Sequence, residues 1–457
     1  LQDLTYLQHS LPRDYRNQYI NRLNQNLKLS AGISYNWAFR NISLQPEYNY
    51  AYSYIKTDNP LYRLDKISGR DSSLFDRLPS ATSILATVLD NGNTYHFTEY
   101  QNSHQFNFCY RDLHSKLLKC EISVNLPVRI AHANLYYQRM GRHDVSRQSI
   151  FFEPNIWLRG NAWEIKAKMN SELPDLTTMV NYRDDSNPMN IILGNTQLRN
   201  IHYYDIEGGK TFEGKKHSRL NINTGYHQTD NAVAYSLVFD KQTGVSTVQP
   251  ISVNGNYRID LGIGYTRPLD KKEKLSIDNQ ASFNYNHNVD MAMVQGATQS
   301  QRSIVNNWKI SNVLKLNYRP DDNYEFTLHG GGTYYLIKSQ REGFSNIHAG
   351  DYNIGMNAQI TLPWKLQLTT DLTMFARRGY QLSEMNTTDW IWNAQLSRSF
   401  INKKLLVKLQ GFDMLRQLSN TQYLMNAQGR TETWNNSIPR YVMLSLSWRF
   451  NVNPKKK

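Results

Sequence analysis

The chain has few cysteines, no long apolar run and no recognisable catalytic motif. Its 457 residues include two cysteines, too few for a disulfide framework. No stretch approaches the ~18 apolar residues of a membrane-spanning helix, and the mean hydropathy is −0.63. These features exclude a helical membrane protein and a disulfide-stapled domain. They leave open a β-barrel, whose membrane strands are apolar only at alternate positions.

The two cysteines, Cys109 and Cys120, flank an expected turn. Aligning the apolar faces of the two flanking strands points Cys109 inward and Cys120 outward, because side chains alternate between the faces of a strand. We therefore predict two free thiols.

No catalytic constellation stands out, so we predict no enzyme activity, no catalytic residue, no bound cofactor and no metal. The twelve histidines are scattered, and HExxH, CxxC, GxSxG and phosphate-loop patterns are missing. The run from Asp184 to Asn187 offers oxygen ligands for calcium, but an Asx-rich turn is the favoured interpretation. Trp390 and Trp392 could stack a sugar, yet on an alternating strand they fit a lipid-facing girdle better.

Positive charge exceeds negative by 14. The basic clusters are short and lie in expected turns or at the chain end, at 214–216, 270–274, 402–404 and 454–457. They form no stripe interleaved with stacking aromatics, which argues against nucleic-acid binding. Lysines beside anionic lipid headgroups are the simpler explanation, so outer-membrane lipids are the expected partner.

The last strand pattern, RYVMLSLSWRF at 440–450, alternates strictly. Its apolar face carries Val442, Leu444, Leu446, Trp448 and Phe450. A soluble sandwich could use such a strand, but one that ends on aromatics near the chain end is typical of an outer-membrane barrel. We expect these five residues to form a strand that the barrel-assembly machinery reads.

The same alternation runs through the chain from Leu23. It predicts strand boundaries good to a few residues. A first strand spans about 23–39, and its partner begins at 42 and alternates as far as 54. Further strands are expected at 94–111, 117–140, 147–158, 161–171, 201–213, 216–240, 244–267, 274–288, 302–318, 324–337, 349–362, 365–380, 388–400, 403–414 and 438–450. Asp260, Asp278 and Asp371 fall on the polar faces, where they would be costly in a dry sandwich core but not in a wet lumen. The fold class is therefore all-β, a large antiparallel transmembrane barrel.

Short and long connections alternate along this pattern, as expected for periplasmic turns and outer loops. About seventeen strands are counted, whereas closed single-chain bacterial barrels usually have an even number. The chain also begins LQDLTYLQHS, without a signal peptide. We therefore expect residues 1–457 to be the C-terminal barrel region of a longer protein whose barrel has about 22 strands. A miscount of one strand is the rival explanation.

Residues 173–200 carry three spaced motifs: Leu173-Pro174-Asp175, then Asp185-Ser186-Asn187-Pro188, then Gly194-Asn195 with Leu198. They resemble a loop signature of the Bacteroidetes outer-membrane β-barrel family related to TonB-dependent receptors. Arg199-Asn200 departs from the Lys-Pro-Glu usual in that family. Residues 243–269 and 397–417, followed by the last strand, are similar to the long strand and terminal hairpin of the family.

The resemblance implies a bacterial outer-membrane location and TonB-dependent nutrient uptake. It also implies an N-terminal domain, a plug, and a TonB-type energy-coupling protein that acts through the plug, none of which is visible in these residues. A surface lipoprotein is a further candidate partner. The alternatives are a non-transporting barrel that binds or anchors a surface partner, and a passive channel.

Overall fold

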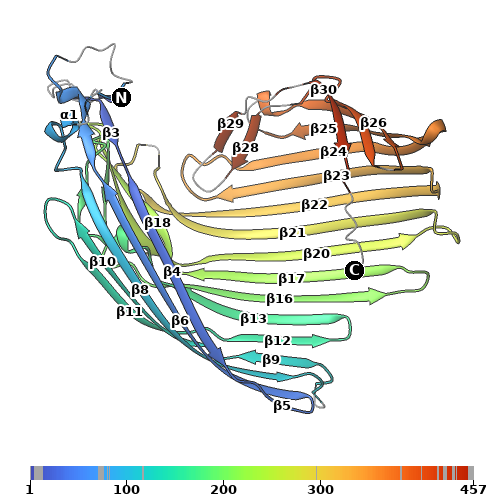
Figure 1. Ribbon diagram of the computed structural model, residues 1–457, viewed down its shortest axis with the longest axis horizontal. Helices are drawn as coiled ribbons and strands as arrows, with labels where there is room; N and C mark the ends of the chain where they lie inside the picture. Colours follow the sequence, from blue (N-terminus) through green and yellow to red (C-terminus); the bar gives the residue numbers. More distant parts are fainter. Residues whose placement is uncertain are drawn as a thin grey trace.

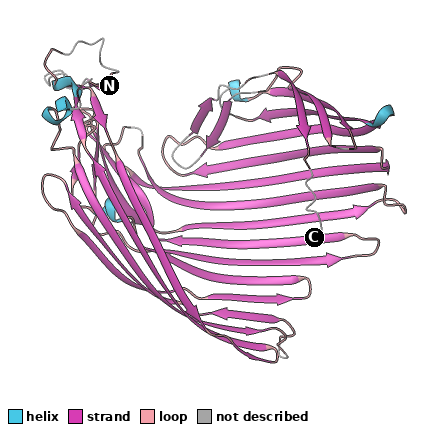
Figure 2. Ribbon diagram, in the orientation of Figure 1, coloured by secondary structure: helices cyan, strands magenta, loops and turns pink. Residues whose placement is uncertain are grey.

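The structure is a computed structural model that describes residues 2–4, 14–69, 77–79, 81, 83–115, 118–294, 296–380, 383–402, 404–418, 421–425, 430–434, 438 and 440–450. Strands dominate it, and the helices are few and short (Figure 2). None of the described helices is long and apolar enough to cross a membrane. The expected basic cluster at 454–457 lies outside the described residues.

One large antiparallel sheet of twenty strand segments forms a curved wall (Figure 1). The segments are β4 (Leu23–Ser34), β5 (Trp37–Phe39), β6 (Ile42–Asn59), β8 (Tyr95–Asp112), β9 (Glu121–Asn125), β10 (Val128–Gln138), β11 (Val145–Phe152), β12 (Asn155–Gly160), β13 (Trp163–Glu172), β16 (Ile201–Glu213), β17 (Arg219–Asp230), β20 (Asn256–Pro268), β21 (Leu275–Ala292), β22 (Gln301–Asp321), β23 (Tyr324–Ser339), β24 (Ile347–Leu362), β25 (Leu366–Arg378), β26 (Thr388–Phe400), β27 (Leu405–Phe412) and β30 (Tyr441–Trp448).

Three pairs of these segments are single strands with a short interruption. β4 and β5 both pair with β6, and β9 and β10 both pair with β8. β11 pairs with β10 and β12 pairs with β9, so β11 and β12 lie along the same interrupted strand. Pro127 and Pro154 lie in the two facing gaps, where a residue without a backbone N–H weakens the ladder. Counting each pair once leaves seventeen strands of the twenty segments, which agrees with the number predicted from the sequence.

The wall has an apolar outer face and a polar inner face. The register sets Leu261 beside Phe283 on the outer face, and Asp260 beside Asn284 on the inner face. Trp392 pairs with Leu372 on the outer face, as expected for a lipid-facing girdle. The period of two in the sequence therefore translates directly into a greasy outside and a wet lumen.

The connections differ at the two ends of the wall. At the turn end they are short, at 40–41, 113–120, 161–162, 214–218, 269–274, 322–323, 363–365 and 401–404. At the loop end they are longer or carry structure of their own, at 60–94, 139–144, 173–200, 231–255, 293–300, 340–346, 379–387 and 413–440. This alternation matches the expected periplasmic turns and outer loops, so we take the loop end as the outside.

The strand order runs from β4 to β30, which lie apart in Figure 1. Registers join β4 to β6 at one end of this order and β27 to β30 at the other. No register joins β4 to β30 among the described residues. Neighbouring strands are antiparallel, so the first and the seventeenth run in the same direction, and a wholly antiparallel closure would take an odd number of further strands.

Smaller elements lie outside the wall, most of them in connections between the expected strands. They are β1 (Gln2–Leu4), β2 (Asp14–Arg16), β3 (Gln18–Ile20), β7 (Leu61–Arg63), η1 (Leu64–Lys66), α1 (Ser83–Thr87), η3 (Leu176–Met179), β14 (Arg183–Asp184), β15 (Asn190–Leu193), β18 (Ala232–Phe239), β19 (Ser246–Val253), η4 (Pro363–Lys365), η5 (Ser383–Met385), β28 (Thr421–Met425) and β29 (Arg430–Trp434). β18 and β19 fall within the expected strands at 216–240 and 244–267. These two expected strands each bend, at Asn231 and Gly255, which both have positive φ.

β14, β15, β19 and β18 form a separate four-stranded sheet at the loop end. Its central pairing, β15 with β19, is parallel, which is the exception in a chain of antiparallel hairpins. This pairing ties residues 173–200 to the hairpin β18–β19, although the two are separated in sequence by wall strands β16 and β17.

Candidate solute-binding site at the loop end

The inner segment, residues 173–200, folds against the inner face of the wall. Leu176, Met179, Val180 and Leu198 pack on Ala133, Leu135 and Tyr137 of β10 to form a buried apolar cluster. Those three β10 residues belong to the inner face, since the register places Ile130 and its even-numbered neighbours outside. The segment thus lies inside the mouth of the wall.

The spaced motifs of the inner segment are structural. Asp175 Oδ1 caps η3 by accepting a hydrogen bond from the Thr177 amide at 2.9 Å. Asn195 Nδ2 donates to the Pro250 carbonyl at 2.8 Å and so fastens the segment to β19. At Gly194, a Cβ would lie 1.7 Å from the Val180 carbonyl oxygen, so any larger residue would push apart the backbone around Gly194 and the backbone around Val180.

Arg139, just beyond β10, fixes the inner segment to the wall. Its side chain is 1% exposed and forms an ion pair of 3.1 Å with Asp184. It also donates to the Gly92 carbonyl at 2.8 Å and to Asn93 Oδ1 at 2.5 Å, and it lies 4.4 Å from the centre of the Tyr182 ring. One guanidinium therefore connects the end of β10, the loop before β8 and strand β14.

The Asp184 carboxylate is held in its charged form. Burial acts to raise its pKa, but hydrogen bonds from Arg139 and the Ser186 amide outweigh burial and lower the pKa below its ordinary value. The Asx-rich turn expected at 184–187 is present, with Ser186 and Met189 amides bonded to Asp184 and Asn187. Among the described residues, no group of histidine, cysteine, aspartate and glutamate side chains is arranged to hold a metal ion.

A cavity of about 990 Å³, which we call the outer cavity, lies between the inner segment and the wall. Its wall side comes from β4, β6, β8, β10, β13 and β16, and its roof from the inner segment, β18 and β19. Carboxylates and aromatic rings both line it, including Glu99, Glu172, Asp175, Tyr95 and Tyr137. The volume is at the upper end of small-molecule sites.

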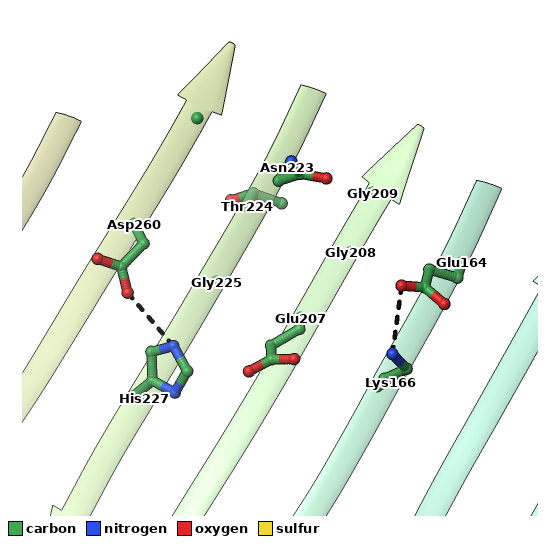
Figure 3. A pocket seen from close by; sticks show the side chains of 11 residues that line it. Glu164, Lys166, Glu207, Gly208, Gly209, Asn223, Thr224, Gly225, His227 and Asp260 are labelled. Carbon is green, nitrogen blue, oxygen red and sulfur yellow. Dashed lines mark hydrogen bonds and ion pairs between the residues drawn. The ribbon is translucent and has the colours of Figure 1, made fainter. Parts of the chain in front are cut away.

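A smaller hollow of about 280 Å³ lies on the inner face of β13, β16, β17 and β20 (Figure 3). Gly209, Gly225 and Gly262 leave its floor without side chains. Around it the charges pair with one another: His227 lies 2.5 Å from Asp205 and 3.3 Å from Asp260, while Lys166 lies 3.2 Å from Glu164. In these contacts the charged side chains of the hollow bond to one another.

The residues expected to form the assembly strand are largely where the pattern predicted. Val442, Leu444 and Leu446 lie on the outer face of β30, paired with β27, and Trp448 is the last residue of the strand. Phe450 lies beyond the end of β30 and is 83% exposed, so the predicted strand extends two residues too far. That the assembly machinery reads this strand stays a prediction.

Both cysteines are free, as predicted. Cys109 lies in β8, and Cys120 is buried just before β9.

The outer cavity was not predicted from the sequence, although the residue pattern of β10 indicates it. Ala131, Ala133, Leu135 and Tyr137 are apolar or aromatic residues on an inner face that is polar elsewhere. An apolar run facing a wet lumen indicates that something packs on it.

Residues 297–448 match the Outer membrane protein beta-barrel family, and no curated protein matches the chain. Two solved structures are among those that a structure comparison matches to the chain. The copper transporter OprC is 10% identical with a TM-score of 0.39, and the match covers 96% of this chain and 74% of that one. The FrpB iron transporter from Neisseria meningitidis (F3-3 variant) is 11% identical with a TM-score of 0.29, covering 87% and 69%.

These two names describe those proteins and assign neither metal to this chain. The family match, together with the apolar outer face and wet inner face of the wall, places the chain in a bacterial outer membrane as a β-barrel protein.

Proposed function

We propose that this chain forms the wall of an outer-membrane receptor that captures a solute from outside and passes it through the lumen. The observation that carries the proposal is the inner segment, which folds into the mouth of the wall and encloses the outer cavity of about 990 Å³. A barrel that served only as an anchor would not need such a cavity in its lumen.

The transport cycle that we propose is TonB-dependent. Residues 1–457 would supply the C-terminal part of the barrel, and an odd number of further strands and a plug would come from elsewhere in a longer protein. The plug would gate the lumen and contact a periplasmic TonB-type coupling protein. The resemblance of the motifs at 173–200 to TonB-dependent receptors supports this cycle, as does the wet inner face.

Two measurements on the complete protein test the proposal. In a planar lipid bilayer, a gated receptor should show no steady ion conductance, whereas a passive channel would conduct at once. Site-specific crosslinking to the periplasmic domain of the coupling protein should give a product that increases when solute is bound. Closed conductance without any crosslinked product would instead support a surface binding or anchoring barrel.

A further inference from the structure

The outer cavity carries more negative charge than the chain neutralises. Glu99, Glu172 and Asp175 line it, and no salt bridge to any of the three occurs among the described residues. Arg22 is the basic residue in the lining, and its guanidinium is bonded to Asn59 and to the Tyr95 hydroxyl at 2.9 and 3.0 Å. This acidic excess contrasts with a chain whose net charge is +14.

Glu99 is the most telling of these carboxylates. The residue is 6% exposed and lies on the inner face of β8. One carboxylate oxygen accepts a hydrogen bond of 2.5 Å from Gln101 Nε2, and the other has no hydrogen-bond or ionic partner in the described part of the chain. A buried carboxylate is costly unless a cation or further donors meet it, so this group is poised for a donor that enters the cavity.

Aromatic rings lie beside Glu99 on the same face. Tyr95 and Phe97 precede it at every second position of β8 and stack on Tyr137 of β10, with ring centres 5.5 and 6.4 Å from that of Tyr137. Such rings bury apolar carbon and attract ammonium and guanidinium groups through their faces. Tyr235 of β18 adds a further ring to the lining.

A bare metal ion does not fit this arrangement. The described residues contain no cluster of three or more side chains suited to hold one. The lining combines separate carboxylates with a broad aromatic surface, and the volume far exceeds that of a single ion.

We propose that the outer cavity binds an organic cation, with ammonium or guanidinium groups on an apolar body. Glu99 and Asp175 neutralise its charge, while Tyr95, Phe97 and Tyr137 pack on its carbon chain. A free polyamine and a short basic peptide both have this chemistry. The inference deepens the proposed function, since it names the class of solute captured, but binding itself requires no transport.

Isothermal titration of the complete protein in detergent micelles tests the proposal. The probes are spermidine, the peptide Lys-Tyr-Lys, the peptide Glu-Tyr-Glu and Cu²⁺ alone. We expect at least one cationic probe to bind with one-to-one stoichiometry, and its identity separates a polyamine source from a peptide source. We expect Glu-Tyr-Glu and Cu²⁺ not to compete with it.

Glu99→Gln should weaken cation binding at least tenfold. The substitution keeps an acceptor for Gln101, so the local fold is retained. Asp175→Asn is a second variant in an exposed position, where asparagine also caps helices well, and it should weaken binding in the same direction. The matched control is Glu325→Gln, which removes an inner-face carboxylate at the turn end and should leave binding unchanged.

The proposal is overturned if neither cationic probe binds, if the acidic peptide binds equally well, or if Glu99→Gln binds like the unaltered protein. Binding of Cu²⁺ that depends on Glu99 would also overturn it, in favour of a metal site. A negative titration result would not affect the crosslinking and conductance measurements. The proposal of cation binding can therefore be refuted without refuting the proposal of transport.

Discussion

Replacing Arg139 with methionine should loosen the inner segment from the wall. Methionine keeps an unbranched apolar stem of similar reach but removes the guanidinium. The change deletes the ion pair with Asp184, the hydrogen bonds to Gly92 and Asn93, and the contact with the Tyr182 ring.

The expected magnitude follows from what remains after the change. Breaking a buried ion pair by removing one partner costs roughly 3–5 kcal/mol. Asp184 is 33% exposed and keeps its bond from the Ser186 amide, and the Gly92 carbonyl keeps the Tyr182 hydroxyl. These remaining contacts place the cost near the lower limit, at about 3 kcal/mol, which raises the equilibrium constant for opening the segment on the order of 100-fold.

Native-state hydrogen exchange measures this opening. The Asn195 amide donates to the Thr178 carbonyl, and the Tyr182 amide to the Val180 carbonyl, so both report whether the segment is folded. Their protection should fall on the order of 100-fold in the Arg139→Met variant, while protection in the middle of β21 stays unchanged.

Arg142 provides the control. It lies three residues further along and pairs with Asp144, but its side chain is 70% exposed, and exposed pairs contribute about 0–1 kcal/mol. Arg142→Met should therefore alter protection by a factor of about five at most. Equal effects of the two variants, or no loss of protection in Arg139→Met, would refute the idea that Arg139 holds the segment.

Four further predictions concern other features of the molecule. Because the Asp184 pKa is lowered in the folded state, its stabilisation should be complete above the ordinary value of 3.8 and lost as the pH falls further. Exchange measured between pH 7 and 3 should show this acid opening, and Arg139→Met should weaken the dependence, because the Ser186 amide still bonds the carboxylate. Phe283→Arg, on the outer face at the middle of β21, should destabilise the barrel in lipid vesicles by roughly 2–4 kcal/mol in urea titrations, whereas Ser282→Arg on the inner face should be tolerated; similar losses would mean that the faces are reversed. Trp448→Ala and Leu446→Arg should slow insertion into the outer membrane, followed as the heat-modifiable band on gels, while Ser447→Ala should not, and normal insertion of both variants would remove the assembly role from β30. Gly194→Ala should reduce protection of the inner segment because its Cβ would collide with the Val180 carbonyl, whereas at Gly262 a Cβ meets open space and alanine should leave exchange unchanged.

The wall could be predicted from the sequence because its residues obey one local rule. A strand between lipid and water needs an apolar side chain at every second position. Each stretch of about ten residues shows this alternation by itself, without reference to the rest of the fold. Segments such as Ile201–Glu213 and Thr388–Phe400 were therefore predicted to the residue, and the alternation of turns and loops followed from the same rule.

The loop-end structure obeys no such local rule. The core around Leu135 is completed by Leu176 and Leu198, which lie tens of residues away and belong to no periodic pattern. The partner of Asp184 is an arginine 45 residues earlier, and β15 finds its partner β19 across two wall strands. Long-range contacts of this kind depend on how the wall curves, which the alternation alone does not encode. The prediction that the last strand includes Phe450 was wrong for a different reason. The alternation in the sequence continues to Phe450, whereas the register between β27 and β30 ends where Leu405 pairs with Trp448.

The parallel pairing of β15 with β19 joins two of the outer connections, the inner segment and the β18–β19 hairpin. β18 and β19 continue into the wall strands β17 and β20, while β15 belongs to the inner segment that roofs the cavity. Three registered residue pairs, from Asn190–Ser246 to Ile192–Val248, join them. Displacement of the roof therefore pulls on a hairpin whose two strands continue into the membrane wall.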